Sequence, residues 1–443
     1  MKEESKSDRF IEDGRDEMEF ELMHPASQIC RIMERVYDMD MTSLTGGNIS
    51  VMDDEGVMWV TPTSIDKKSL KPEDIVKVLP DGKIVGKHKP TSEYYIHRSI
   101  LTRRPDIKAV IHAHAPATVT LSVLNRVPKT RAYQGAYEMI GEPKLTPYAL
   151  PGSMELVKRV MEAFEAGHDS AILEKHSAFV GSKRGLLDAF KRFEALDFAA
   201  RIEINSHILG KIRVLDKCIL KEKQLPAVTG MRTFIVKRHT GKELEIRENL
   251  HSAIKRGYSK KLFTSGGGVM SARVDEKSFL IPESGTDNGT ITLSELTEVK
   301  NGCREEKKFP HKTAILHQKI YEKHPDIQAV IIAAPVYTMG FAVTDMAYDT
   351  ILYPESYGVL CDANRYGFEE FFNDIETVVQ NLDLKHPMAI VENYGVILVG
   401  PTPILTFDKL EVCESSARSI HESHRLGLKP ILMTQEQINE MNS

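Results

Sequence analysis

The chain has 443 residues, of which 41% are hydrophobic and 27% charged, and its formal net charge is −5 at pH 7. This composition is that of an ordinary globular protein, and it excludes a largely disordered, collagen-like or membrane-embedded chain. The slight acidity leaves no electrostatic footprint for nucleic acid. The five cysteines are scattered without a CxxC pair, and no apolar run suits a signal peptide or a membrane span. We therefore predict a cytoplasmic protein whose partners include neither nucleic acid nor a membrane.

The sequence repeats itself in tandem. The segment RPDIKAVI (104–111) matches HPDIQAVI (324–331) at an offset of 326 − 106 = 220 residues, and His97 falls on His317 at the same offset. Self-similarity at a fixed offset indicates two copies of one domain. We predict an N-terminal extension, a first domain, a charged linker, a second domain and a C-terminal tail, at 1–21, 22–210, 211–249, 250–430 and 431–443.

The first half of each copy begins with strand signals and passes into a helix. The runs GNISVMD (47–53) and GVMWVTP (56–62) are rich in β-forming residues and predict a hairpin. The segment SEYYIHRSILTRRP (92–105) has apolar positions at helical spacing and ends at a proline, which predicts a helix. The β-branched run AVIHAHAP (109–116) predicts a strand.

The second half of the copy continues the alternation. The segment SMELVKRVMEAFEAG (153–167) predicts an amphipathic helix with Ser153 as its N-cap and Gly167 beyond its end. The run AILEKHSAFV (171–180) predicts one further strand, and residues 185–204 predict a long helix. Alternating strands and helices indicate an α/β sandwich in which helices cover a sheet. The strand order does not follow from these signals.

Two histidines on one strand could bind a metal ion. Successive side chains of a strand alternate between its faces, so His112 and His114 point to the same side. His176, at the end of the next apolar run, could supply a third ligand. Three histidines with an open fourth position form a catalytic zinc arrangement, although HxH pairs are often purely structural.

The second copy acts as an internal control on this hypothesis. There the three histidines are replaced by Ile332, Ala334 and Tyr394, while the surrounding apolar frame persists. A shared function would be lost in this way, whereas independent core histidines would be lost piecemeal. The comparison therefore favours a metal site in the first copy alone.

Glu93 follows the same pattern. It lies at the start of the predicted helix, where the helix dipole favours a carboxylate, and its counterpart in the second copy is Thr313. Helix capping by Glu93, or by Thr91 and Ser92, explains the position equally well. The joint loss with the histidines nevertheless associates the carboxylate with the predicted metal site.

Two loops have the composition of an anion-binding site. The turn Gly46-Gly47-Asn48 exposes backbone N–H groups, and residues 61–64 and 91–92 add hydroxyl donors near a helix N-terminus. Glycine turns and hydroxyl caps are common, so each signal is weak by itself.

Taken together, TGGNIS, TPTS, PTSE, HAHA and the later single histidine resemble, in order and spacing, the class II aldolase/adducin family. The resemblance covers residues 22–210 strongly and 250–430 as a degenerate second copy. It implies a class II aldolase-like three-layer α/β/α sandwich in two tandem copies. It also implies a metal-dependent aldehyde-lyase of carbohydrate metabolism.

The resemblance carries over to individual residues. It implies one Zn²⁺ per chain on His112, His114 and His176, with Glu93 moving the proton at the carbon beside the substrate carbonyl. Tyr148, in LTPYALPGS, resembles a tyrosine that acts as an acid in a neighbouring subunit's site. The positions that would hold the substrate phosphate are Asn48, Thr63, Ser64, Thr91 and Ser92.

The sequence departs from the family pattern in three places. The family often has glycine where Ser64 stands, serine where Thr91 stands, and glycine after the third histidine, where this chain has Ser177. Ser64 and Thr91 are bulkier than the family residues and crowd the expected phosphate pocket, so a phosphorylated substrate is less firmly implied than zinc.

The resemblance favours a zinc-dependent aldolase that cleaves a ketose-1-phosphate-like sugar phosphate through a metal-stabilised enediolate. A dehydratase, decarboxylase or epimerase could use the same site, although the epimerases carry aspartate at the position of Glu93. The alternative from another class is a non-enzymatic, adducin-like interaction module, which would hold no stoichiometric zinc.

Family active sites lie between the subunits of a fourfold ring. Because two homologous domains are joined in this chain, we predict a homo-oligomer in which two chains could form a pseudo-fourfold ring. If active and inactive domains alternated around it, a residue of the second domain would have to replace Tyr148. Tyr357 and Tyr366 lie near the corresponding place.

Overall fold

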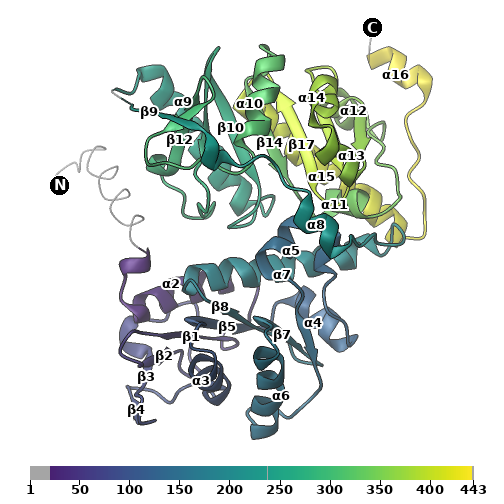
Figure 1. The fold of residues 1–443 in the computed structure, drawn as a ribbon. Helices are drawn as coiled ribbons and strands as arrows, with labels where there is room; N and C mark the ends of the chain where they lie inside the picture. The colour runs from purple at the N-terminus through teal and green to yellow at the C-terminus, as the bar shows by residue number, and fades with distance from the viewer. Residues whose placement is uncertain (1–19, 237, 442–443) are drawn as a thin grey trace, which may run out of the picture. The chain divides into compact units, whose positions relative to one another are not determined.

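The structure is a computed structural model that describes residues 20–236 and 238–441 (Figure 1). The chain forms two compact units. The first extends to Thr130 and resumes from Ala136 to Arg201, and the second comprises Arg131–Gly135 and the chain from Ile202 onward. The predicted extension at 1–21 falls almost wholly outside the described residues. Among those residues, no helix is both long and apolar enough to cross a bilayer.

The first unit is built on a sheet of eight strands. Their order is β4-β3-β2-β1-β5-β8-β7-β6, and every neighbouring pair is antiparallel except β6 and β7. β5 lies between β1 and β8, so its backbone is paired with a neighbouring strand on both sides. The strands are β1 (Asn48–Met52), β2 (Met58–Val60), β3 (Val76–Val78), β4 (Ile84–Val85), β5 (Ala109–Ala113), β6 (Lys144–Thr146), β7 (Ser170–Leu173) and β8 (Ala178–Ser182).

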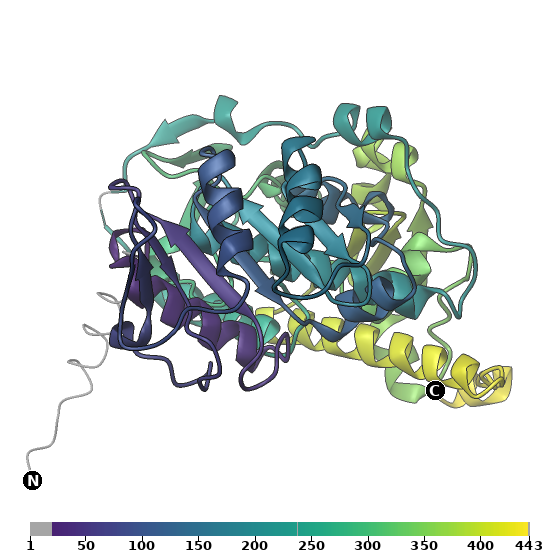
Figure 2. The same ribbon diagram turned by 90° about the horizontal axis from the view of Figure 1, so that it is seen from below.

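Helices cover both faces of this sheet. α2 (Pro25–Asp38) and α7 (Leu186–Ser206) lie on one side, and α3 (Tyr94–Arg103) and α6 (Met154–Glu165) lie on the other (Figure 1). Figure 2 looks onto the side of α3 and α6, whose apolar residues form one buried cluster with the sheet. The shorter helices of this region are α4 (Pro116–Val123) and α5 (Gln134–Ile140).

The second unit repeats this architecture around a nine-stranded sheet. Its order is β15-β16-β17-β14-β10-β11-β12-β13-β9. With β14 equivalent to β5 and β10 to β1, the equivalent strands follow the same order as in the first sheet, and β9 is added at the edge. The strands are β9 (Arg232–Phe234), β10 (Val269–Asp275), β11 (Ser278–Pro282), β12 (Leu296–Lys300), β13 (Cys303–Glu305), β14 (Ala329–Ala333), β15 (Ala363–Tyr366), β16 (Met388–Val391) and β17 (Gly395–Gly400).

The helices of the second unit also match. α10 (Ala314–Lys323) and α14 (Ile375–Asn381) contribute to one apolar cluster with the sheet, and α9 (Gly241–Ser259) and α15 (Pro403–Arg425) contact the sheet and each other. Residues 211–249, predicted as the linker, contain α8 (Lys217–Glu222), β9 and the first turns of α9. The remaining helices are α11 (Val336–Val343), α12 (Pro354–Leu360), α13 (Phe368–Asn373) and α16 (Gln435–Met441).

Most of the predicted elements of the first copy are present. The hairpin forms between β1 and β2, and Ser153 caps α6 by accepting a hydrogen bond from the N–H of Leu156 at 3.2 Å. The single strand predicted for 171–180 is wrong. The structure has a hairpin there, β7 and β8, with a turn in which Lys175 adopts a left-handed φ of 58°.

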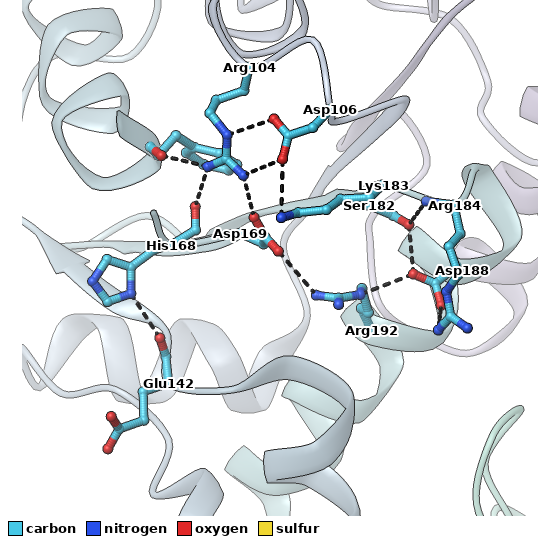
Figure 3. A network of polar contacts seen from close by, with 11 residues as sticks. Arg104, Asp106, Glu142, His168, Asp169, Ser182, Lys183, Arg184, Asp188 and Arg192 are labelled. Carbon is cyan, nitrogen blue, oxygen red and sulfur yellow. Dashed lines mark hydrogen bonds and ion pairs between the residues drawn. The ribbon is translucent and has the colours of Figure 1, made fainter. Parts of the chain in front are cut away.

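A network of ion pairs closes the end of the first sheet where β5 begins (Figure 3). The guanidinium of Arg104 donates to both carboxylate oxygens of Asp106 at 2.8 Å and to Asp169 at 2.9 Å. It also donates to the carbonyl of Phe164 at 2.6 Å, which joins α6 to this end of the sheet. The hydrogen bonds from Arg104 lower the pKa of Asp106. The histidines lie at the opposite end of β5.

Candidate functional site

Three histidine side chains converge at the C-terminal end of β5. His112 is on the strand, His114 follows its end, and His176 lies in the turn between β7 and β8. Their ring centroids are 4.9, 4.8 and 5.1 Å apart. One nitrogen atom from each ring lies within 4.8 Å of the others, and no other group of three possible ligands is found in residues 20–236 and 238–441. The structure thus brings together the three residues predicted as metal ligands.

The environment of His112 leaves one ring nitrogen free for a metal ion. Its Nδ1 hydrogen-bonds the carbonyl of Ala178 at 2.9 Å, and its ring stacks on Phe179 at 4.3 Å between centroids. Since a carbonyl only accepts, Nδ1 carries the proton and Nε2 presents a lone pair. This Nε2 is buried and has no hydrogen-bond partner in the described part of the chain. A buried unpaired acceptor among neutral imidazoles fits a divalent ion such as zinc.

Electrostatics keep the three histidines neutral. Burial lowers the pKa of His112 well below its usual value, and His176 and His114 lower it further. Burial also lowers the pKa of His114 and of His176, against the opposing effect of Glu93. Neutral imidazole is the form that binds a metal ion, so this site needs little deprotonation before it can do so.

Glu93 lies beside the histidines. It is the N-cap residue of α3, but its side chain makes no capping hydrogen bond, so the capping explanation does not account for it. Its Oε2 accepts a hydrogen bond from Asn48 Nδ2 at 2.9 Å and lies 3.3 Å from His112 Nε2. Its Oε1 is 3.8 Å from His176 Nε2, is buried and has no hydrogen-bond partner among the described residues. A carboxylate is therefore held against the three histidines with one oxygen free.

Register places Asn48 at this point. β1 pairs with β5 so that Asn48 is directly opposite His112, which puts the Gly46-Gly47 turn beside the histidines. A Cβ on Gly46 would lie 3.4 Å from His114 Nδ1, and Gly47 has a left-handed φ of 70°. Small residues in this turn let the backbone approach the site closely.

The other predicted substrate-binding residues lie on two adjacent loops. Pro62 and Pro90 form a β-bridge, so residues 61–64 run beside residues 89–92. In these loops Thr91 is buried, Thr63 is half-buried, and Ser64 and Ser92 are exposed.

Ser64 has a φ of 55°, a conformation that glycine adopts without strain, and its counterpart in the second copy is Gly285 with φ 86°. The register that pairs them rests on equivalent main-chain hydrogen bonds, from Thr63 N to Lys89 O and from Ser284 N to Phe309 O. The conformation of the backbone explains why the family favours glycine at Ser64.

Tyr148 is not part of the buried cluster. It follows β6, and its side chain is 51% exposed. Its main-chain N–H donates to Glu174 Oε2 at 3.0 Å. By strand register its counterpart in the second copy is Phe368, which is buried, whereas Tyr366 corresponds to Thr146 and is buried in the second core. Tyr366 therefore does not occupy the position equivalent to Tyr148.

Three further residues support the site, and the sequence did not predict this role for them. Ser177 is buried and donates from its hydroxyl to the carbonyl of Ala113, which fastens the His176 turn to β5. Lys67 is 1% exposed and donates to the carbonyl of Pro62, while burial lowers its pKa to about 8. His97 Nε2 is hydrogen-bonded to the side-chain oxygen of Asn48. His97 left a sequence signal because it recurs as His317, and Ser177 because it stands where the family often has glycine, whereas Lys67 left none.

The second copy fills the equivalent place with apolar side chains. Val269 is opposite Ile332 in the register that pairs Asn48 with His112. Val269 and Ile332 are buried in the second core, and Tyr394 packs against it, with ring contacts to Phe371 and Phe372. This part of the second unit is therefore core rather than a ligand site.

Comparison with known proteins identifies the family. The model of the class II aldolase and adducin N-terminal domain matches this chain twice, over residues 27–204 and 248–421. The chain belongs to the class II aldolase and adducin family. Both copies carry its fold, so the predicted class II aldolase-like α/β fold in two tandem copies is confirmed.

Individual relatives match about one domain of this chain. A 5-methylthioribulose-1-phosphate/5-deoxyribulose-1-phosphate aldolase from Rhodospirillum rubrum is 32% identical over 157 residues, covering 35% of this chain and 70% of the relative. A 3-oxo-tetronate 4-phosphate decarboxylase from Haemophilus influenzae is 28% identical over 170 residues, covering 38% and 80%. A solved L-fuculose 1-phosphate aldolase is 30% identical, with a TM-score of 0.42, and covers 45% of this chain and 93% of its own.

Proposed function

We propose that the protein is a zinc-dependent class II aldolase that cleaves a ketose 1-phosphate by a retro-aldol reaction. The observation that carries the proposal is the buried Nε2 of His112, unpaired beside two other neutral histidines and a carboxylate. His112, His114 and His176 would hold the ion. The aldolase relatives support a sugar-phosphate substrate.

The residues of the site divide the reaction between them. A divalent ion on the three histidines would supply positive charge beside the ketone oxygen, where negative charge develops. In the cleavage direction a base takes the proton of the C4 hydroxyl, the C3–C4 bond breaks, and its electron pair passes into an enediolate. Glu93, which begins the cleavage protonated, then donates its proton to C3 and regains one from water, and the products are an aldehyde and dihydroxyacetone phosphate.

The proton on Glu93 would be held at Oε1. This oxygen is buried and has no hydrogen-bond partner among the described residues, while Oε2 is bound by Asn48. We propose that Thr63, Ser64, Thr91 and Ser92 hold the phosphate, together with a remaining N–H of Asn48. Tyr148 is proposed as the group that exchanges a proton with the C4 oxygen, acting from a neighbouring subunit.

Decarboxylation is the second candidate. A relative of this chain is a 3-oxo-tetronate 4-phosphate decarboxylase, and loss of CO₂ from a 3-oxo acid also leaves an enediolate-like carbanion beside a carbonyl. The same ion and the same protonation by Glu93 would serve it.

The test is a panel of purified compounds assayed with the zinc-loaded full chain. Ketose 1-phosphates, L-fuculose 1-phosphate and 5-deoxyribulose 1-phosphate included, are scored for release of dihydroxyacetone phosphate, and 3-oxo-4-phosphate acids for release of CO₂. We expect retro-aldol turnover that a chelator abolishes and added zinc restores. Release of CO₂ without aldehyde would favour the decarboxylase. A chain that binds no stoichiometric metal would instead indicate a non-enzymatic, adducin-like module.

A further inference from the structure

A row of four buried polar side chains ends at Glu93. Ser50 Oγ lies 2.6 Å from His97 Nδ1, His97 Nε2 lies 2.5 Å from Asn48 Oδ1, and Asn48 Nδ2 lies 2.9 Å from Glu93 Oε2. Ser50 and His97 are fully buried, and Asn48 and Glu93 are 5% and 6% exposed. The row therefore runs from Ser50 in the core to Glu93 beside the three histidines.

Each hydrogen bond in this row fixes the direction of the next. Glu93 Oε2 accepts from Asn48, so the amide nitrogen of Asn48 faces it and the amide oxygen must face His97. His97 must then donate from Nε2, which leaves Nδ1 to accept from the hydroxyl of Ser50. Burial lowers the pKa of His97 to about 3, so the ring stays neutral and holds this one tautomer.

The second copy retains only the first half of the row. Ser271 Oγ lies 2.7 Å from His317 Nδ1, as in the first copy, and also 2.7 Å from the hydroxyl of Tyr321. At the far end, His317 Nε2 is buried and finds no hydrogen-bond partner in the described residues. The place of Asn48 is taken by Val269, which cannot accept.

This contrast separates structural from functional requirements. The serine–histidine pair is present in both copies, although the second copy has no asparagine beyond it. The pair therefore belongs to the fold and does not depend on Asn48. The histidine–asparagine–glutamate half is present only where the three histidines are also present. In its absence a ring nitrogen remains buried and unpaired, which costs stability.

We propose that His97 and Asn48 are positioning residues that fix the orientation of the Glu93 side chain, with Oε2 bound to Asn48 and Oε1 directed to the substrate carbon. The proposal rests on the proposed function. In it His97 never touches the substrate and acts only by orienting the amide of Asn48. Without the donor on His97, the amide of Asn48 can turn its oxygen toward Glu93 and repel the carboxylate.

Three variants test this proposal. His97→Phe keeps a flat ring of similar size and removes the donor, whereas His97→Gln keeps an N–H close to the position of Nε2. His317→Phe is the matched control, since His317 has the same burial and the same serine contact but no asparagine beyond it. All three are compared with the wild type for zinc content and thermal unfolding, which establishes that each variant folds and is loaded.

The assay follows deuterium exchange into dihydroxyacetone phosphate in D₂O, which probes only the proton transfer at carbon. We expect His97→Phe to lower kcat about tenfold, the value of one hydrogen bond, with KM within about twofold. His97→Gln should recover to within about threefold of the wild type, and His317→Phe should match it. Equal kcat in His97→Phe and the wild type would overturn the proposal.

A double-mutant cycle tests the route through Asn48. Asn48→Val copies the second copy, and in that background His97→Phe should cost less than about twofold, because the intermediary is already absent. If His97→Phe cost the same with and without Asn48, the histidine would act by another path and the proposal would be wrong.

One further measurement is independent of catalysis. Nitrogen-15 spectra of the metal-free protein, assigned by comparison with His97→Phe, should show His97 neutral and protonated at Nε2. Protonation at Nδ1 would overturn the arrangement whatever the activity. A wild type that exchanges no deuterium but shows this tautomer would contradict the proposed function and leave the hydrogen-bond arrangement supported.

Discussion

The two copies share one carboxylate that caps a helix and differ at another carboxylate. In the first unit Asp197 accepts hydrogen bonds from the N–H and the hydroxyl of Thr118 at the start of α4, both at 3.3 Å. In the second, Glu414 accepts from the N–H and hydroxyl of Thr338 at the start of α11, at 2.9 and 2.8 Å. This capping contact between helices survives in both copies, although the residue changed from aspartate to glutamate.

The second copy has no carboxylate at the position of Glu93. Its position is occupied by Thr313, and the ligand positions are occupied by apolar or aromatic residues that pack into the core. A carboxylate that satisfies the backbone of a helix was kept because removing it would leave buried N–H groups unpaired. Glu93 caps no helix and accepts from the side chain of Asn48, and neither residue has a polar match in the second copy that makes this contact. The difference supports the proposed chemical role of the histidines and Glu93 of the first unit.

The largest expected effect is the loss of the metal ion. We predict one divalent ion per chain, and His112→Ala should lose both the ion and turnover, since two histidines cannot close the site. Elemental analysis of the purified protein measures the occupancy. The matched control is Ile332→Ala, which should keep the ion. Two ions per chain, or full occupancy in His112→Ala, would contradict the comparison of the two copies.

Next in size is the loss of the proton carrier. Glu93→Gln keeps the shape of the side chain and should keep the ion, but kcat should fall about 10²–10⁴-fold because the base is gone. Thr313→Val, the equivalent position in the second copy, serves as the control and should leave kcat unchanged. A decrease of less than about threefold in Glu93→Gln would show that another group moves the proton.

How much of this could be predicted from the sequence differs between fold and site. The hairpin and the capped helix α6 follow from local signals, and both are present. The single strand predicted for 171–180 is wrong because two apolar runs flank a short polar turn. Lys175 adopts a left-handed conformation there, although lysine is not one of the residues typical of turns. The resulting hairpin places His176 in a turn rather than on a strand.

The grouping of the three histidines could be predicted because it depends on local periodicity and on the internal repeat. The row behind Glu93 could not, because it depends on the register of β1 against β5, which sets Asn48 opposite His112. The structure shows the side chain of Asn48 bound to Glu93, a contact that its predicted role in holding phosphate did not include. Pairing across strands distant in sequence is invisible to local patterns.

A smaller effect is expected at Tyr148, whose counterpart Phe368 has no hydroxyl. If Tyr148 acts as the acid in a neighbouring subunit, Tyr148→Phe should lower kcat about tenfold with the ion retained. The protein must then be a homo-oligomer, which light scattering measures directly. A monomer at micromolar concentration would contradict this role. Unchanged turnover in an oligomer would favour a ring of alternating active and inactive domains.

The smallest expected effect concerns the buried Lys67, which replaces the neutral Asn288 of the second copy. Asn288 N donates to Ser265 O as Lys67 N donates to Leu44 O, which sets the correspondence. Burial lowers the pKa of Lys67 from 10.5 to about 8, so its ammonium destabilises the folded state at neutral pH. A destabilising cation on the carbonyl of Pro62, the residue before Thr63, fits a loop kept for anion binding.

Lys67→Met separates stability from binding. It removes a desolvation cost of up to about 3 kcal/mol and one hydrogen bond worth about 1 kcal/mol, so unfolding should cost roughly 1–2 kcal/mol more at pH 7. Between pH 8 and 10.5 the unfolded wild type binds more protons than the folded one, so the wild type gains stability as pH rises and the advantage of the variant shrinks.

The same variant should raise KM for a phosphorylated substrate several-fold while it stabilises the fold, and the two effects together identify a residue kept for function. Lys409→Met is the control, because Lys409 also donates from its ammonium to a carbonyl, that of Val359 at 2.6 Å, but in the second unit. It should leave KM unchanged. Denaturant unfolding at pH 7 and pH 10 with steady-state kinetics measures both quantities, and a less stable Lys67→Met at pH 7 would show that the ammonium supports the fold.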